Sequence, residues 1–261
     1  MKITIVGTGN VAFHLGKRLR GQGVEINQII GRDALKAAWL GEILKAKSAT
    51  FYEKIDTSSD IYVLAVADGA IAEVAEKLSK SIDNQLVVHT SGSIASTVLK
   101  PFFRNFGVFY PLQTFSIGSQ PNFEQIPIFV NTTPQYHADL IRKIAEKVTP
   151  RVFFISDEDR MTLHVAAVFV NNFVNHLFRI GSEIVNQKQL PFDILLPLIE
   201  ETVNKIRQNT PADMQTGPAR RGDDVTVEKH IDFLEKNTPQ YELLYTLLSI
   251  SINPNLKINH M

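Results

Sequence analysis

The fold is decided by the first stretch of the chain, Ile3-Thr4-Ile5-Val6-Gly7-Thr8-Gly9-Asn10-Val11-Ala12. A β-branched run ends in Gly-x-Gly, and apolar residues at helical spacing follow at once. This order predicts a strand, a tight turn and a helix N-terminus, a corner that binds a pyrophosphate through free backbone N–H groups. Ala12 is an allowed residue at the third position of the G-x-G-x-x-G/A pattern. The residues that we expect to contact a dinucleotide are Gly7, Thr8, Gly9, Asn10 and Val11; the alternative is a purely structural turn.

From this stretch to about residue 90, strand-like and helix-like segments alternate with short connections. The expected strands are 3–6, 24–30, 49–52, 61–66 and 86–88, and the expected helices are 11–20, 34–44 and 70–78. Further strands are expected at 107–110, 126–130 and 152–155, with a helix at 134–148. Such alternation predicts an α/β fold built on a doubly wound parallel sheet.

After Ser156 the pattern becomes helical, with helices expected at 157–185, 192–208, 225–236 and 240–250. We therefore predict two domains, a dinucleotide-binding domain over 1–156 and an all-helical domain over 157–261. Between residues 165 and 178 the helix is apolar around much of its circumference and needs cover on several faces. A core shared by two copies would supply that cover, so we expect a homodimer through the C-terminal helices; a core within one copy is the alternative.

The composition excludes several classes of partner and of functional site. Lys+Arg and Asp+Glu balance at 27 each in 261 residues, so no net charge attracts nucleic acid or an anionic membrane. Cysteine is absent, which excludes disulfides and thiolate sites, and no other metal-ligand spacing is visible. No run of about 18 apolar residues and no secretory signal is present. We expect a soluble cytoplasmic protein whose partner is a small-molecule substrate, with no metal.

The most informative single residue after the glycines is Arg32, which lies at the end of the second expected strand. An NAD enzyme places a carboxylate there against the ribose 2′-hydroxyl, whereas a guanidinium can bind a 2′-phosphate. Arg32 therefore indicates NADP as the cofactor, although a solvated surface arginine is the competing interpretation. The adjacent Asp33 is expected to be the N-cap of the next helix.

Two more strand ends face the same edge of the sheet. Ala65, Val66 and Ala67 lie at the end of the fourth expected strand, where small residues let the backbone run beside the cofactor, and Asp68 is expected to cap the next helix. Thr90 and Ser91 follow the fifth strand, in His-Thr-Ser-Gly-Ser at 89–93, where they would face the nicotinamide and substrate. A polar loop with a capping serine explains the latter equally well. The stretch 110–116 either closes the pocket or only packs.

Three candidate residues come from the helical half. His164 and Asn172 interrupt an apolar helix at i and i+8, where His164 would donate a proton and Asn172 would orient the substrate. A buried amide network between helices is the alternative. Arg221, in Thr-Gly-Pro-Ala-Arg-Arg-Gly-Asp at 216–223, would clamp a substrate carboxylate or pair with neighbouring aspartates.

Together, the N-terminal motif, Arg32, Ala-Val-Ala-Asp at 65–68 and the helical C-terminal half resemble the pyrroline-5-carboxylate reductase and 6-phosphogluconate dehydrogenase-like group. The stretches 89–93, 110–115 and 216–223, with His164 and Asn172, are similar to a bacterial branch that pairs a Rossmann-like NADP-oxidoreductase domain with a C-terminal domain of unknown function. The resemblance implies NADP binding, a helical domain that often dimerises and a site between the domains. It departs from the β-hydroxyacid dehydrogenases in having His164 near the position of their catalytic lysine.

The expected function is therefore that of an NADPH-dependent oxidoreductase. It would transfer hydride to a small C=O or C=N substrate that bears a carboxylate, as pyrroline-5-carboxylate reductases or oxo-acid reductases do. The expected catalytic residues are His164, Asn172, Ser91 and Arg221. A non-catalytic NADP(H)-binding sensor or scaffold is the alternative.

Overall fold

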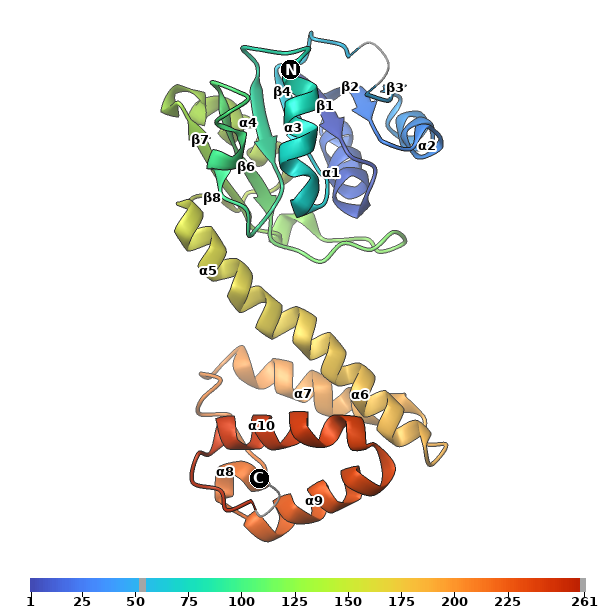
Figure 1. Cartoon of the computed structure of the whole chain (residues 1–261), viewed down its shortest axis with the longest axis vertical. Helices are drawn as coiled ribbons and strands as arrows, with labels where there is room; N and C mark the ends of the chain where they lie inside the picture. Colours follow the sequence, from blue (N-terminus) through green and yellow to red (C-terminus); the bar gives the residue numbers. More distant parts are fainter. Residues whose placement is uncertain (52–54, 259–261) are drawn as a thin grey trace. The chain divides into compact units, whose positions relative to one another are not determined.

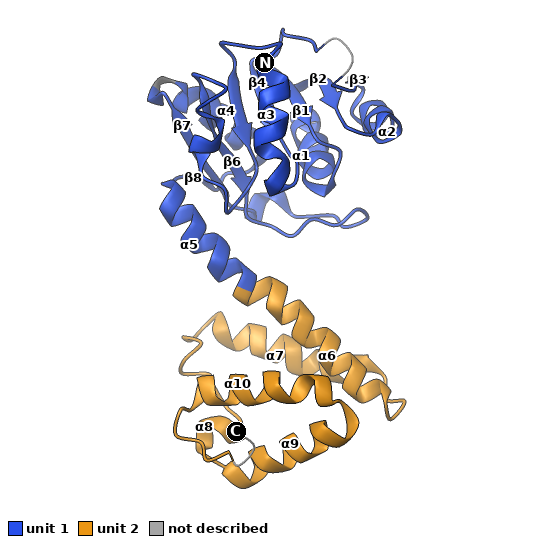
Figure 2. Ribbon diagram, viewed as in Figure 1, with its two compact units in different colours: residues 1–168 blue, residues 169–261 orange. Residues whose placement is uncertain are grey.

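A computed structural model describes residues 1–51 and 55–258. The chain divides into two compact units, Met1–Val168 and Phe169–Met261 (Figure 2), which we describe separately. Within the described residues, no helix is both long and apolar enough to span a membrane.

The first unit is built on an eight-stranded sheet with the order β3-β2-β1-β4-β5-β6-β7-β8 (Figure 1). Its strands are β1 Lys2–Val6, β2 Glu25–Ile30, β3 Lys47–Ala49, β4 Ile61–Leu64, β5 Leu86–His89, β6 Phe106–Pro111, β7 Ile128–Thr133 and β8 Val152–Phe154. Every neighbouring pair is parallel except β6 and β7. The predicted Rossmann-type doubly wound sheet is confirmed, with one antiparallel pairing that the sequence pattern did not reveal.

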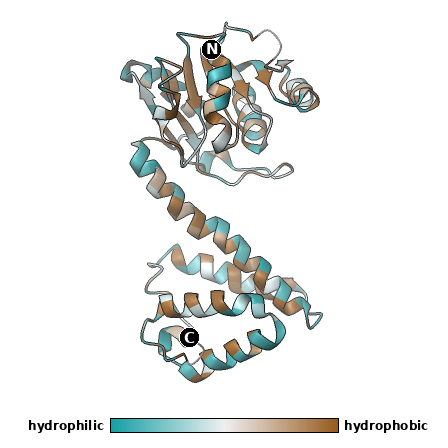
Figure 3. Ribbon diagram, in the orientation of Figure 1, coloured by the Kyte–Doolittle hydropathy of each residue, from teal (hydrophilic) through white to brown (hydrophobic). Residues whose placement is uncertain are grey.

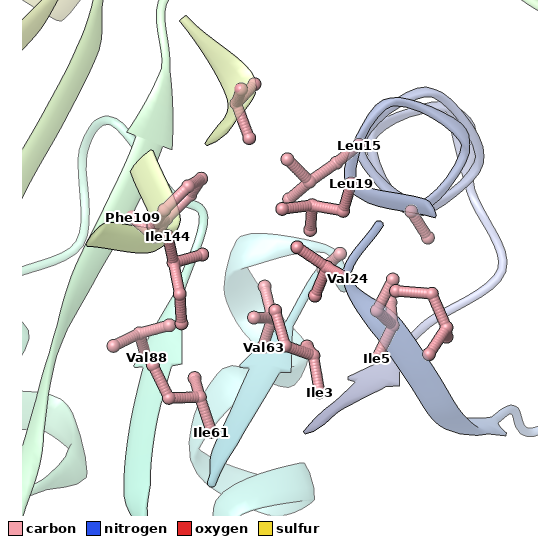
Figure 4. Close-up of a cluster of buried hydrophobic side chains, with 14 of the residues drawn as sticks. Ile3, Ile5, Leu15, Leu19, Val24, Ile61, Val63, Val88, Phe109 and Ile144 are labelled. Carbon is pink, nitrogen blue, oxygen red and sulfur yellow. The ribbon is translucent and has the colours of Figure 1, made fainter. Parts of the chain in front are cut away.

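Helices cover both faces of this sheet. They are α1 Asn10–Gly21, α2 Ala34–Leu44, α3 Ile71–Ser79 and α4 Ala138–Val148. Helix α5, Asp157–Ala167, follows β8 and contributes no residue to the two cores against the sheet. Ile3 and Ile5 of β1 point into a core with α1, α2 and α4 (Figure 4), whereas Val6 points into a second core with α3. Because successive side chains of a strand alternate between faces, continuous apolar runs such as 61–64 feed both cores.

The expected elements of this unit differ from the structure mainly at their ends. The third strand was expected at 49–52 and lies at Lys47–Ala49; Tyr52 is outside the described residues. The fourth strand ends at Leu64 because its chain then turns into the 3₁₀ segment Asp68–Ala70 ahead of α3. Helix α2 has the expected bounds, with Asp33 confirmed as its N-cap: one carboxylate oxygen accepts from the backbone N–H of Leu35 and Lys36.

The second unit is helical. Its elements are α6 Val174–Asn186, α7 Leu196–Ile206, α8 Pro218–Arg221, α9 Asp224–Asn237 and α10 Glu242–Ile252. Between α5 and α6 the expected long helix contains a π-helical segment, Val168–Phe173. The short α8 was not expected, because Thr-Gly-Pro gives only a turn signal. Figure 3 shows apolar residues on several helices of this unit, yet its described buried cluster is small, with Ala219, Val227, Ile231 and Leu256 as its members.

Candidate functional site

The turn after β1 has a geometry that only glycine permits. Gly7 has a φ of +126°, and a Cβ there would lie 2.1 Å from the carbonyl oxygen of Ala65. The backbone N–H of Gly7 donates to the carbonyl of Ile30 at 2.8 Å, and the N–H of Ala65 donates to that of Val6 at 2.7 Å. The end of β1 is therefore drawn tightly against the ends of β2 and β4, where strand order reverses and such folds bind dinucleotides.

The N-terminus of α1 is free to accept an anion. Its N-cap, Gly9, makes no side-chain capping bond, and its first turn has no acidic residue. A Cβ on Gly9 would meet no protein atom within 4 Å, so the space in front of the helix is open. Uncapped N–H groups and the positive end of the helix dipole are what a pyrophosphate requires. The residues present fit the phosphates of a dinucleotide.

A cavity of about 420 Å³ opens at the carboxyl ends of β1, β2 and β4. Of the expected cofactor-contacting residues, the structure brings seven together in its lining: Gly7, Thr8, Gly9, Arg32, Ala65, Val66 and Ala67. Asn10, Val11 and Thr90 do not line it. The Asn10 amide instead donates to the carbonyl of Phe115 at 2.7 Å, so this side chain holds the 112–116 loop on α1.

The rim of this cavity carries charges that the sequence pattern did not single out. Lys36 and Lys77 line it together with Arg32. Lys77 pairs with Glu73 at 2.6 Å, and this hydrogen bond lowers the pKa of Glu73. Arg32 and Lys36 are exposed and make no side-chain bond within the described parts of the chain, so both remain available to a phosphate. Spacing from a strand end identified Arg32, whereas Lys77 reaches the rim through the packing of α3.

A second group of polar residues lies after β5, and most of it is buried. The Ser91 hydroxyl accepts from the backbone N–H of Ser93 at 3.2 Å and of Ile94 at 3.0 Å, which folds residues 91–94 into a turn. The Ser93 hydroxyl donates to the carboxylate of Asp68 at 2.7 Å. Asp68 therefore does not cap the next helix as expected: the 3₁₀ segment there has Ala67 at its N-cap position and no side-chain capping bond.

His89 is a buried, neutral histidine with a partner at one ring nitrogen, whereas its Nε2 is buried with no hydrogen-bond partner among the described residues. Its Nδ1 accepts from the backbone N–H of Ser91 at 3.2 Å. Burial, followed by the nearby charge of Arg160, lowers its pKa to about 4. A ring that stays neutral at physiological pH acts here as an acceptor for the turn and carries no charge.

The turn touches two side chains with proton-donating groups. The Tyr110 hydroxyl and His164 Nδ1 lie 3.1 Å apart, within hydrogen-bond distance. A Cβ on Gly92 would come within 2.4 Å of His164 Nδ1 and 2.7 Å of the Tyr110 ring, so only glycine allows both rings to approach the turn. Burial raises the pKa of Tyr110, which keeps its proton. The structure thus brings the expected Ser91 and His164 into one corner.

An ion pair that no sequence pattern indicates holds that corner together. Arg160 is 1% exposed, and its guanidinium donates to Asp157 at 2.5 Å and to the carbonyls of Gly92 and Ile94. Asp157 also accepts from Asn131 at 2.9 Å and from both the N–H and hydroxyl of Ser96. Burial would raise the pKa of Asp157, but these hydrogen bonds outweigh it and lower the pKa. Asp157 was expected only as the start of a helix.

The remaining candidates belong to the second unit. Asn172 lies in the π-helical segment and Arg221 ends α8; both side chains are exposed. Asp223 is the N-cap of α9 and accepts from the N–H of Thr226 at 3.1 Å. The roles of Asn172 and Arg221 toward a substrate stay predictions. No group of three or more His, Asp or Glu side chains that could hold a metal occurs among the described residues.

The fold and the glycine corner define a dinucleotide-binding protein of the Rossmann class. Residues 2–93 match the family described as NADP oxidoreductase, coenzyme F420-dependent, and residues 126–252 match a domain of unknown function, DUF2520. No curated protein sequence matches the chain. A solved structure from Bacteroides fragilis, assigned to the NADP oxidoreductases, is 35% identical, covers 97% of this chain and 98% of its own, and has a TM-score of 0.91.

The chain belongs to this family of NADP oxidoreductases with a DUF2520 C-terminal domain, which confirms the predicted resemblance and the prediction of an NADP-dependent enzyme. Two more distant structures share the fold. A 1-pyrroline-5-carboxylate reductase from Streptococcus pyogenes is 16% identical, with 97% of this chain and 98% of that chain covered and a TM-score of 0.62. An imine reductase from Myxococcus stipitatus in complex with NADP⁺ is 15% identical, with 98% and 95% covered and a TM-score of 0.61.

Proposed function

We propose that this protein is an NADPH-dependent reductase of a small C=O or C=N substrate that bears a carboxylate. The observation that carries the proposal is the uncapped, glycine-lined N-terminus of α1 at the mouth of the β1–β2–β4 cavity. When bound there, NADPH supplies a hydride to the carbon of the double bond. The oxygen or nitrogen then needs a proton, and this chain's residues must deliver it.

For the cofactor, the chain offers two kinds of contact. Backbone N–H groups of Gly9, Asn10 and Val11 would hold the pyrophosphate, and Ala65–Ala67 would let the chain pass close to it. Arg32 and Lys36, exposed at the rim, would bind the 2′-phosphate that distinguishes NADPH from NADH.

For the proton, the Tyr110–His164 pair is the candidate. The Tyr110 hydroxyl has one proton and no acceptor other than His164 among the described residues, so it would donate to Nδ1. With Nδ1 as the acceptor, the ring proton lies on Nε2, from where it would pass to the substrate oxygen or nitrogen. The Tyr110 hydroxyl proton would move to Nδ1 in the same step, so that the ring gains no net charge, and water would then reprotonate the Tyr110 oxygen. Asn172 would orient the substrate and Arg221 would bind its carboxylate, as the sequence pattern predicts.

The test is NADPH oxidation over a panel of cyclic imines, including 1-pyrroline-5-carboxylate, and of 2-oxo and 3-oxo acids. With a substrate that reacts, His164→Ala should lower kcat by about 100-fold and leave the Kd for NADPH within about twofold. His230→Ala is a matched control, because His230 Nδ1 makes a similar bond of 2.7 Å to Tyr245 in the second unit. NADPH binding without oxidation of any substrate, retained in His164→Ala, would instead favour a non-catalytic NADP(H) sensor.

We also propose that the second unit is covered by a second copy of the chain. Large apolar side chains are exposed on it, among them Phe169 at 63%, Leu198 at 67% and Leu243 at 64%. Monomeric proteins rarely expose apolar patches beyond a few hundred Å², whereas obligate dimers bury about 2,000 Å² or more. Sedimentation velocity should give twice the chain mass, and a monomer at micromolar concentration would contradict the proposal. Cytoplasmic location stays a prediction.

A further inference from the structure

The side chain of Arg160 is an unusual feature of the first unit, because a guanidinium is seldom this fully buried. Two of its hydrogen bonds go to carbonyls in the turn after β5, and the third goes to Asp157 in the first turn of α5. Asp157 pairs with this guanidinium at 2.5 Å, and the Arg160 charge also lowers the pKa of His89. No part of the proposed hydride or proton transfer requires this residue to touch a substrate.

Arg160 is connected to His164 by two routes. The residues are four apart on α5, so they lie one above the other on the same face of the helix. The second route runs through Gly92: its carbonyl accepts from Arg160 Nε at 3.3 Å, and its Cα faces the rings of His164 and Tyr110. A shift of this glycine would therefore move directly against the imidazole.

These hydrogen bonds depend on the planar, forked shape of the guanidinium. It donates at once to the carbonyls of Gly92 and Ile94, which fixes the turn at both ends, and to Asp157 on its own helix. A lysine ammonium would keep the charge pair with Asp157, but as a point charge it lacks the rigid fork that spans the two carbonyls. Arginine and lysine should therefore differ here.

We propose that Arg160 is a positioning residue for the proton-donating pair. It acts through Gly92 and Ile94 to hold the His164 ring against the Tyr110 hydroxyl, so that the imidazole keeps its proton on Nε2. This inference deepens the proposed function and rests on it for its kinetic consequence, whereas its structural part concerns the imidazole alone.

The structural part is tested without any substrate. Two-bond ¹H–¹⁵N spectra of the histidine rings report which nitrogen of His164 carries the proton. The wild type should show one tautomer, with the proton on Nε2, and Arg160→Lys should show a mixture of tautomers or exchange broadening. Arg151→Lys, at an exposed arginine that donates to the carbonyl of Gln125, is the matched control and should leave the spectrum unchanged. An unchanged His164 spectrum in a folded Arg160→Lys protein would overturn the proposal.

Should Arg160→Lys fail to fold, the double variant Arg160→Gln with Asp157→Asn removes both charges and leaves no ion buried without a partner. The same change in the His164 spectrum is expected, and its absence again overturns the proposal. The Kd for NADPH should stay within about twofold in either variant, because neither residue lines the cofactor cavity. A parallel loss of NADPH affinity would mean that Arg160 supports the whole unit and does not act through His164.

The kinetic part separates this inference from the proposed function. With a substrate that reacts, Arg160→Lys should lower kcat by about 10- to 100-fold with little change in KM. Combined with His164→Ala, it should cause no further loss, since the group on which it acts is already gone. Multiplying losses would overturn the proposal. A wild-type protein that turns over no substrate would contradict the proposed function and leave the tautomer result to decide this inference.

Discussion

The two polar regions of the first unit are built in opposite ways. The cofactor cavity is made by backbone and by exposed cations: Gly7 and Gly9 shape it, and Arg32 lies at its rim with no hydrogen bond or ion pair from its side chain among the described residues. The corner around Ser91 and His164 is made by buried side chains that bond to one another, with Arg160 and Asp157 at its centre. The cavity is left ready for a ligand, whereas the corner has already used its polar groups to fix its own shape.

Because buried bonds hold the corner around Ser91 and His164, substitutions there should have the largest effect on stability. Asp157→Ala leaves the Arg160 charge buried without its partner and should lower the free energy of unfolding by about 3–5 kcal/mol. Urea unfolding at neutral pH measures this. Glu158→Ala, at an exposed neighbour whose side chain makes no bond among the described residues, serves as control. A loss below about 1 kcal/mol for Asp157→Ala would show that the corner is not held by this pair.

The corner should also be sensitive to acid. Burial, and then the charge of Arg160, lowers the pKa of His89 from 6.5 to about 4, so between these values the unfolded chain binds a proton that the folded chain does not. The contribution of neutral His89 to the free energy of unfolding is therefore present in full above pH 6.5. It is lost as the pH falls toward 4, and the loss amounts to about 3 kcal/mol. Urea unfolding between pH 7 and 4 should show a steeper decline for wild type than for His89→Asn, whose amide oxygen can accept from Ser91. Equal slopes would refute this.

In the cofactor cavity, substitutions that disturb the backbone should change stability and NADPH binding more than substitutions of the exposed side chains. Gly7→Ala places a Cβ 2.1 Å from the Ala65 carbonyl at a φ of +126°, so it should cost about 2–3 kcal/mol of stability and abolish NADPH binding. Gly9→Ala meets no protein atom and should retain the melting temperature while weakening NADPH binding. Thermal melts and NADPH titrations separate the two, and similar melting temperatures would show that the turn tolerates a side chain at residue 7.

The smallest effect on the fold should come from the exposed cation. Arg32→Ala should leave the melting temperature unchanged but weaken NADPH binding about tenfold, or about 1.4 kcal/mol, with NADH affinity unaltered. Lys36→Ala should act in the same direction, because this lysine lines the same cavity. A wild type that binds NADPH and NADH equally would contradict the assignment of Arg32 to the 2′-phosphate.

Much of the fold could be predicted from the sequence because local rules suffice for it. Helix α2 has its expected bounds since Asp33 caps it and the chain beyond it takes a left-handed residue at Lys45. The antiparallel pairing of β6 with β7 was not predictable in this way, because the residues of a strand do not indicate whether its neighbour runs parallel or antiparallel to it. Likewise, Asp68 has the position of a cap, but a serine 25 residues later takes its carboxylate.

The sequence by itself determined the cofactor cavity. Gly-Thr-Gly after a strand, with Arg32 at the end of the next strand, specifies a turn, an uncapped helix and a cation at fixed spacings, all of which are short-range. Only the tertiary structure decided the corner around His164. This corner contains residues from four separate parts of the chain: Ser91, Tyr110, Asn131 and Arg160. They bond to partners that are distant in sequence because buried polar groups need hydrogen bonds, and only the folded chain brings those partners together.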